Sequence, residues 1–116
     1  MMDTISNHLR RHLLNKEKPM PSLEELKESE WDSAFESLMR NRLIMGAFRY
    51  GLFKDGARGY DRLTSIRQRL DLFESTGNGE HLVDVANLAL MIYHYKDHTK
   101  FHFKSVDDGI HAEKKP

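Results

Sequence analysis

The chain has 116 residues, with 18 basic and 18 acidic side chains and no cysteine. This length indicates one domain with a single hydrophobic core, and not a multidomain enzyme. The balanced charge argues against strong non-specific binding to nucleic acid, which normally requires an excess of basic residues. The lack of cysteine excludes disulfides, thiolate catalysis and cysteine-ligated metal sites, so any metal would be held by oxygen or imidazole ligands.

Two features of the sequence bear on its location. The first 15 residues carry several charged side chains and therefore do not resemble a secretory signal. No segment reaches the roughly 20 consecutive apolar residues that cross a bilayer. We therefore expect a soluble, cytoplasmic protein that does not bind membranes.

In chain order, the first predicted elements are helices. Residues 3–16 have apolar side chains at every fourth position and are predicted to form a short amphipathic helix, which Pro19 and Pro21 end. A second short helix is expected over residues 22–28. The pattern Ser29 to Asp32 resembles a capping box, and it predicts a long helix from about Glu30 to Tyr50. The buried face of this long helix is predicted to hold Trp31, Ala34, Phe35, Leu38, Met39 and Met45.

Glycines mark the ends of the later helices. Gly51 is predicted to end the long helix, and Gly77 to end a third helix that Asp61 or the residue before it caps. Asn78 can cap a fourth helix, over about residues 79–95, which is the most apolar part of the chain and is therefore expected to be central and buried. The sequence thus predicts an all-α fold: a compact four-helix domain over residues 1–106, with one short N-terminal helix, one long helix and a buried central C-terminal helix. Residues 107–116 are predicted to be a flexible tail.

The apolar fourth helix carries a narrow polar stripe. At 100° per residue, one face collects Glu80, Asp84, Asn87 and, if the helix continues, His94. Polar groups are costly to bury unless they are paired, so this stripe must have partners. It suits a metal or phosphate site in a helical bundle, and it equally suits a structural hydrogen-bond network.

The expected partners of the stripe are arginines. Arg42 and Arg49 lie seven residues apart on the long helix, and Arg58 lies in the following glycine-rich loop. In one interpretation, these three arginines bind a phosphate of a ligand. In the other, an arginine forms an interhelical ion pair with Asp84 or Glu80, whose carboxylates suit bidentate pairing.

Two segments together carry a family resemblance. Residues 45–51 (MGAFRYG) and 76–87 (TGNGEHLVDVAN) resemble small phage-encoded helical proteins, some of them described as dATP/dGTP pyrophosphohydrolases and related to the MazG-like all-α nucleotide pyrophosphatases. This resemblance implies magnesium held by two groups of acids. Glu24, Glu25 and Glu28 match the first group; in the second, Asp84 matches the aspartate and His81 stands at the glutamate position, next to Glu80.

The resemblance leaves three functional classes open. One is a magnesium-dependent nucleotide pyrophosphohydrolase, with metal ligands from Glu80, Asp84, Glu25 and Glu28, phosphate contacts from the three arginines, and support from His81, Asn87 and His94. Another is a phage interaction protein that inhibits a host defence or replication factor. The last is a nucleotide-binding module without turnover. In each case, the wide apolar surface of the fourth helix predicts a homo-oligomer, most simply a dimer.

Overall fold

The structure is a computed structural model, and it describes residues 19–56, 59–106, 109 and 112–116. Two sequence predictions fall outside these residues. These are the amphipathic helix over residues 3–16 and the phosphate-binding role of Arg58. The extent of the predicted domain and of the tail over 107–116 likewise stays a prediction.

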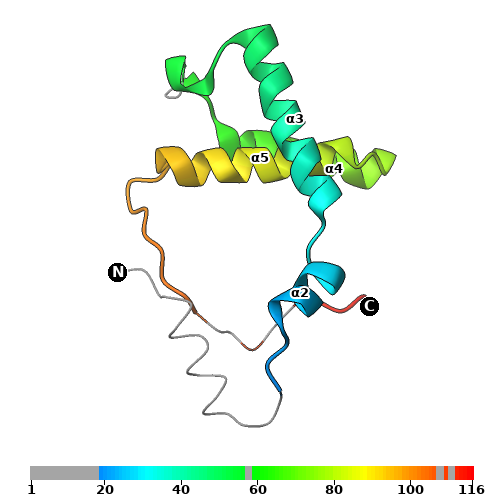
Figure 1. Cartoon of the computed structure of the whole chain (residues 1–116). Coiled ribbons are helices and arrows are strands. Elements are labelled where there is room, and N and C mark those ends of the chain that lie inside the picture. The colour runs from blue at the N-terminus through cyan, green and yellow to red at the C-terminus, as the bar shows by residue number, and fades with distance from the viewer. Residues whose placement is uncertain (1–18, 57–58, 107–108, 110–111) are drawn as a thin grey trace. The chain divides into compact units, whose positions relative to one another are not determined.

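The chain divides into two units, and the larger one, Leu23–Thr99, contains all the helices of the described residues. These helices are α2 (Leu23–Ser29), α3 (Ser33–Tyr50), the short 3-10 helix η1 (Phe53–Asp55), α4 (Arg62–Thr76) and α5 (Glu80–Tyr95) (Figure 1). The described part of the chain contains no strand. The predicted all-α class, with a short early helix, a long helix and a central last helix, is therefore confirmed.

The other unit is formed by Met1–Ser22 and Lys100–Pro116. Its described residues form neither helix nor strand. Within the described ranges, no helix of either unit is both long and apolar enough to cross a membrane.

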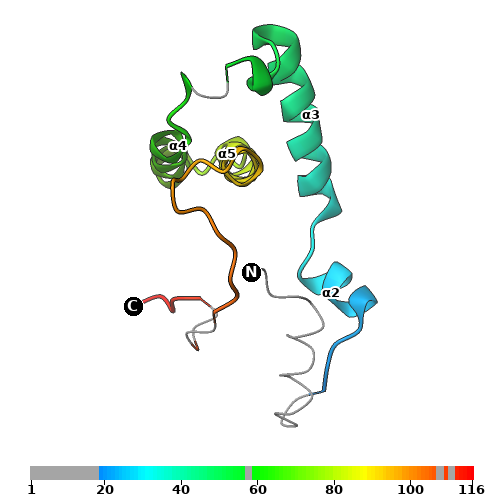
Figure 2. The ribbon, with the colours of Figure 1, turned by 90° about the vertical axis from the view of Figure 1, so that its left-hand side faces the viewer.

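Helix α5 is the centre of the larger unit. It packs side by side with α4, and α3 crosses it at a steep angle (Figures 1 and 2). The packing of α5 is more extensive against α4 than against α3. Its side chain Val83 is the most buried apolar group among the described residues, at 3% exposure. We predicted a central last helix because apolar residues cover most of its circumference. The structure confirms that α5 lies between α3 and α4.

Short polar caps and glycines set the limits of these helices. The carboxylate of Asp32 accepts a hydrogen bond from the Phe35 amide at 2.9 Å and so caps α3. At the end of α4, Gly77 adopts a left-handed conformation with φ of 72°, which favours glycine. The predicted cap of α5, Asn78, lies one residue before the observed N-cap Gly79, and its side chain accepts a hydrogen bond from the Glu80 amide at 3.0 Å.

The predicted start of the long helix was wrong. The helix begins at Ser33 and not at Glu30, because Asp32 is its cap, whereas Ser29 ends α2 and donates its hydroxyl to the Glu25 carbonyl at 2.7 Å. Trp31 consequently lies between the two helices and is exposed. A capping serine and a capping aspartate stand three residues apart here, and the pattern alone does not say which of them starts the helix.

The predicted buried face of α3 was also partly wrong. Leu38 and Met45 are exposed, whereas Met39 and Leu43 are partly buried toward α5. Apolar residues occur on more than one side of this helix, so periodicity does not single out one face. As a result, a second apolar side of α3 stays uncovered by the described residues.

The N-terminal cap of α4 gives a testable dependence on pH. Asp61 accepts hydrogen bonds from the amide and the hydroxyl of Thr64, at 3.1 and 2.8 Å, and these bonds lower the pKa of the Asp61 carboxyl below its ordinary value. Because the folded pKa is below the unfolded one, this contribution to stability is present above the unfolded pKa of about 3.9 and is lost as the pH falls through the folded pKa.

We therefore expect Asp61→Asn, which keeps a capping side chain but cannot titrate, to lose less stability than the wild type between pH 5 and pH 2 (about one unit above and two below the unfolded pKa). Urea denaturation at a series of pH values measures the difference. If the free energy of unfolding fell equally with pH in the two proteins, this role of Asp61 would be contradicted.

Candidate functional site

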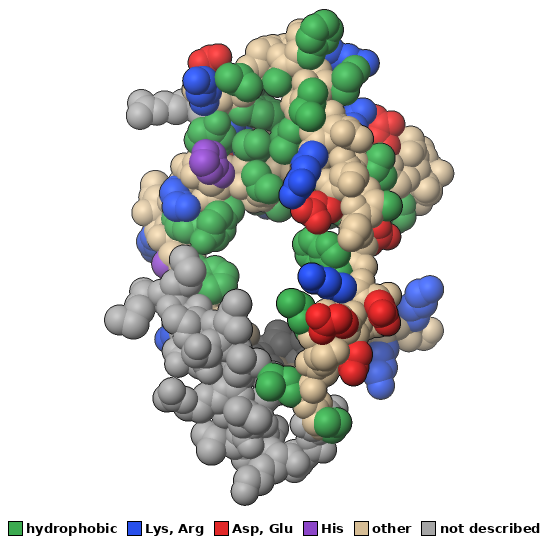
Figure 3. All heavy atoms as spheres, in the orientation of Figure 1, with side chains coloured by type: hydrophobic (Ala, Val, Ile, Leu, Met, Phe, Trp, Pro, Cys, Tyr) green, Lys and Arg blue, Asp and Glu red, His purple; other side chains and the backbone are tan. Residues whose placement is uncertain are grey.

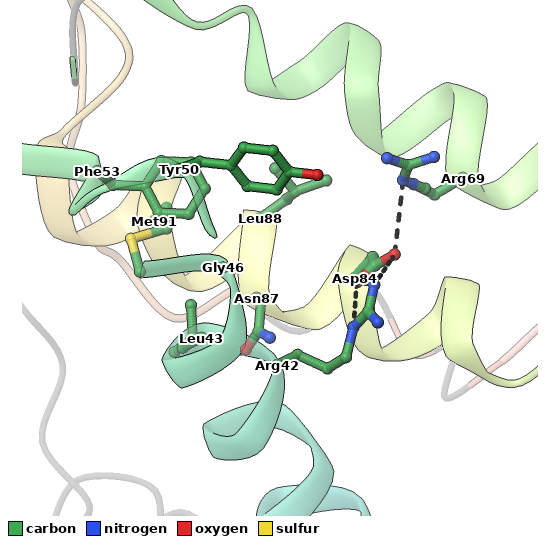
Figure 4. Close-up of a pocket in the computed structure, with 10 residues that line it drawn as sticks. All are labelled: Arg42, Leu43, Gly46, Tyr50, Phe53, Arg69, Asp84, Asn87, Leu88 and Met91. Carbon is green, nitrogen blue, oxygen red and sulfur yellow. Dashed lines mark hydrogen bonds and ion pairs between the residues drawn. The ribbon is translucent and has the colours of Figure 1, made fainter. Parts of the chain in front are cut away.

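The polar stripe of α5 meets arginines from both neighbouring helices. Arg42 of α3 forms an ion pair with Glu80, with Nη1 and Oε1 2.8 Å apart. It also donates from Nε and Nη2 to the two carboxylate oxygens of Asp84, at 3.3 and 3.4 Å. Arg69 of α4 approaches the same carboxylate, with Nε 3.7 Å from Oδ2 (Figure 4). We call Arg42, Arg69, Glu80 and Asp84 the arginine–carboxylate cluster.

This cluster confirms the interhelical ion pair that the sequence offered as one of two interpretations. Its two arginines and two acids carry a formal net charge of zero. Arg42 and Arg69 are partly exposed, so each contact is screened by solvent and contributes modestly to stability. Together they connect α3 and α4 to the same residue of α5, which makes Asp84 the electrostatic link between the three helices.

A pocket of about 230 Å³ begins at this cluster and runs along α5 between the flanking helices. We call it the Asn87 pocket. Arg42, Arg69 and Asp84 lie at one end, and apolar side chains lie toward the other (Figure 4). Its lining consists of Arg42, Leu43, Gly46, Tyr50, Phe53, Arg69, Asp84, Asn87, Leu88 and Met91.

Asn87 is the most buried polar residue of this pocket, at 7% exposure. Its Nδ2 donates to the Met39 carbonyl at 3.0 Å, which links α5 to α3. Its Oδ1 is buried and accepts no hydrogen bond from the residues that the structure describes. A buried acceptor without a donor costs about 1–3 kcal/mol, so this oxygen marks a place where a donor is missing.

Other predicted site residues lie elsewhere. His94 lies at the far end of α5, where its ring packs edge-on against Tyr95 and lines a separate pocket with Leu52 and Lys54. Arg49 is exposed and forms no ion pair with a described residue. His81 is the second residue of α5, and its Nδ1 is buried without a partner in the described part of the chain. Arg49 and His94 therefore do not contact the arginine–carboxylate cluster. Their predicted roles, phosphate binding for Arg49 and support for His94, stay predictions.

The predicted magnesium ligands are on two helices. Glu25 and Glu28 belong to α2, whereas Glu80 and Asp84 belong to α5 and are occupied by Arg42. Across the described ranges, no three acidic or histidine side chains come together as a group that would hold a metal ion. Magnesium normally requires carboxylates free to accept it, so the cluster as it stands suits a structural role better than a metal site.

A second charged site was not found from the sequence. The guanidinium of Arg62 is buried, with 2% of the residue exposed, and pairs with Asp97 at 2.6 Å. It also lies over the rings of Phe53, Tyr60 and Tyr95, at 5.6, 5.6 and 4.9 Å from their centroids. The sequence places Arg62 at the start of a helix, where an arginine is ordinarily exposed, so its burial was not predicted. The nearby Tyr60 was the local sign that Arg62 could contact an aromatic ring.

Comparisons with known proteins do not identify the chain. No family model, curated protein or solved structure matches it.

Proposed function

We propose that this chain is a non-enzymatic interaction protein, which binds an acidic protein partner through the exposed end of α3. The observation that carries the proposal is a pair of aromatic side chains, Phe48 at 85% and Tyr50 at 82% exposure, held on an 18-residue helix. Large exposed aromatic residues are unusual on an isolated protein surface and are typical of interface centres.

Exposed apolar side chains lie on more than one side of the C-terminal end of α3, and we call them together the α3-end patch. Hydrophobic side chains gather in the upper part of the molecule, where α3 ends (Figure 3). Ile44 and Phe48 are one helical turn apart and therefore share a side of α3, whereas Tyr50 lies on the side of the helix that faces the Asn87 pocket. The exposed members of the patch are Ile44, Met45, Phe48, Tyr50 and Leu52.

The charge around the α3-end patch indicates the chemistry of its partner. Residues 37–55 include four basic side chains and one acidic side chain, Asp55. Arg40 and Arg42 are already paired with acids, whereas Arg49 and Lys54 have no ion pair with a described residue. A partner that combines apolar residues with acids would neutralise Arg49 and Lys54 and cover the patch.

The same charges favour a different protein over a second copy of this chain. A symmetric dimer through the α3-end patch would bring two copies of Arg49 and Lys54 close together, and like charges disfavour such an arrangement. The aliphatic members Ile44, Met45 and Leu52 also favour a protein over a nucleic acid, since bases stack on aromatic and not on aliphatic side chains. By the resemblance to phage-encoded proteins, the partner would be a host protein.

A displayed library of random helical peptides tests this proposal, because the peptides that it enriches reveal the chemistry that the patch prefers. We expect the wild type to enrich peptides that combine acidic and apolar residues. Loss of a central interface residue commonly reduces affinity at least tenfold, so Phe48→Ser should weaken binding of the enriched peptides by about tenfold or more. Leu70→Ser, which removes an exposed leucine from α4, is the matched control and should bind them normally.

Three outcomes would overturn the proposal. The first is no enrichment, or enrichment of basic peptides. The second is binding that Phe48→Ser leaves intact. The third is binding of single-stranded oligothymidylate more tightly than of any enriched peptide, which would make the patch a nucleic-acid surface.

The competing function is the magnesium-dependent nucleotide pyrophosphohydrolase. It is tested by thermal shift with dATP and dGTP, each with and without MgCl₂, on the wild type and on Asp84→Ala. A ligand that binds the folded state raises its melting temperature. We expect no magnesium-dependent rise; a rise in the wild type that Asp84→Ala abolishes would restore the enzymatic interpretation.

A further inference from the structure

The Asn87 pocket lies beside the α3-end patch, and Tyr50 belongs to both. Its volume of about 230 Å³ is below the roughly 300–1,000 Å³ that pockets for drug-sized ligands and cofactors occupy. It therefore suits one aromatic side chain or a molecule of that size. Leu43, Leu88 and Met91 supply its apolar walls (Figure 4).

The polar groups of the pocket select a neutral hydrogen-bond donor. Asn87 Oδ1 is a buried acceptor with no donor among the described residues, while its Nδ2 is held by the Met39 carbonyl. The occupant must therefore present an N–H or O–H group to this oxygen. An anionic occupant is disfavoured, because Arg42 and Arg69 are already paired with Asp84, and a phosphate in the pocket would meet the carboxylate of Asp84.

We propose that the Asn87 pocket receives a tryptophan side chain of the partner protein, whose indole N–H donates to Asn87 Oδ1. This inference rests on the proposed function. Among protein side chains, tryptophan combines a flat apolar body with a single donor and no acceptor. Tryptophan is also among the residues that most often anchor an interface. The shared Tyr50 places this anchor at the edge of the surface that the rest of the partner would cover.

The decisive comparison uses indole and 1-methylindole as probes of the isolated protein. The two molecules have similar ring systems, but 1-methylindole has no N–H donor. We expect indole to shift the methyl resonances of Leu43, Leu88 and Met91 in NMR titrations. We expect 1-methylindole to bind roughly 3- to 10-fold more weakly, the size of effect that one net hydrogen bond gives.

Gly46 offers a way to close the pocket without disturbing the fold. It lines the pocket, and a Cβ built at this position meets no atom within 4 Å. Gly46→Leu should therefore fill the pocket and abolish indole binding, and replacement of a helical glycine also favours the helix. Asn41→Leu adds a leucine at an exposed position of the same helix, and it should leave indole binding unchanged.

Asn87→Leu tests the hydrogen bond itself. In this variant, indole and 1-methylindole should bind equally, since neither finds an acceptor. If Asn87→Leu does not fold, the Gly46→Leu and Asn41→Leu pair still decides whether indole occupies this pocket, and the two probes still decide whether its N–H is recognised.

The results separate this inference from the proposed function. Absence of indole binding, or equal binding of the two probes to the wild type, overturns the tryptophan pocket even if acidic peptides are enriched on the α3-end patch. Conversely, indole binding that prefers the N–H, together with a peptide library that yields no acidic binder, supports the pocket and overturns the acidic partner. Enriched peptides that bind Gly46→Leu as well as the wild type also overturn the tryptophan anchor.

Discussion

Replacement of Arg62 by methionine should lower the free energy of unfolding by about 3–5 kcal/mol, because it leaves a partly buried carboxylate without its counter-charge. Arg62 pairs with Asp97 at 2.6 Å and is almost fully enclosed. The Asp97 carboxylate is itself partly shielded from solvent, so water compensates for the loss incompletely. Denaturation by urea, followed by circular dichroism, measures the change.

The aromatic rings around Arg62 add to this effect. Phe53, Tyr60 and Tyr95 come from η1, from the following loop and from the last turn of α5. Arg62 therefore holds three separate segments together at the start of α4. Each cation–π contact contributes about 0.5–2 kcal/mol, and the larger values apply where water is excluded. Lysine has no planar guanidinium to stack on these rings, so Arg62→Lys should also be destabilising.

Two further variants decide whether the Arg62 effect is electrostatic. Arg67→Met removes an exposed arginine from the same helix and should change stability by less than about 0.5 kcal/mol. Combining Arg62→Met with Asp97→Leu removes both charges and should recover part of the loss, because an unpaired buried charge then no longer exists. An Arg62→Met protein as stable as the wild type would contradict this account.

Asp84→Ala should lower the free energy of unfolding by about 1–2 kcal/mol. This is less than the loss expected for a buried ion pair, because both arginines are partly exposed. The substitution removes the partner of Arg42 on α3 and of Arg69 on α4. Glu36→Ala is the matched control. It breaks the exposed Arg40–Glu36 pair within α3, and it should cost less than about 0.5 kcal/mol.

The sign of the Asp84 effect also bears on function. A structural acid stabilises the fold, whereas a residue kept for catalysis often stands in an unfavourable setting, so that its removal raises stability. A higher free energy of unfolding for Asp84→Ala, measured by urea denaturation, would therefore contradict the structural role of the cluster.

Local sequence signals predicted the helices and one contact of the site. Gly51, Gly77 and Asn78 mark helix limits because their conformations and hydrogen bonds depend on adjacent residues. The pairing of Arg42 with Asp84 was also accessible as one of two interpretations, since an acid on an otherwise apolar helix needs a basic partner.

Contacts between distant residues were not accessible in the same way. Arg62 and Asp97 are 35 positions apart, and their pairing depends on how α4 and the end of α5 meet. The open acceptor of Asn87 depends on the orientation of one amide relative to the Met39 carbonyl. The apolar side chain of Trp31 fits the period of the long helix, although the Asp32 cap excludes this residue from it.

The unequal packing of α5 has a consequence for the order of folding. Helices α4 and α5 are joined by the short turn at 77–79 and pack extensively, so bringing them together closes a small loop at low entropic cost. Helix α3 is separated from α4 by a longer connection and has fewer contacts with α5, so we expect it to dock last and to open first. Amide hydrogens of α3 should then exchange with solvent faster than those of α5, and a partner bound at the end of α3 would slow the exchange of that helix most.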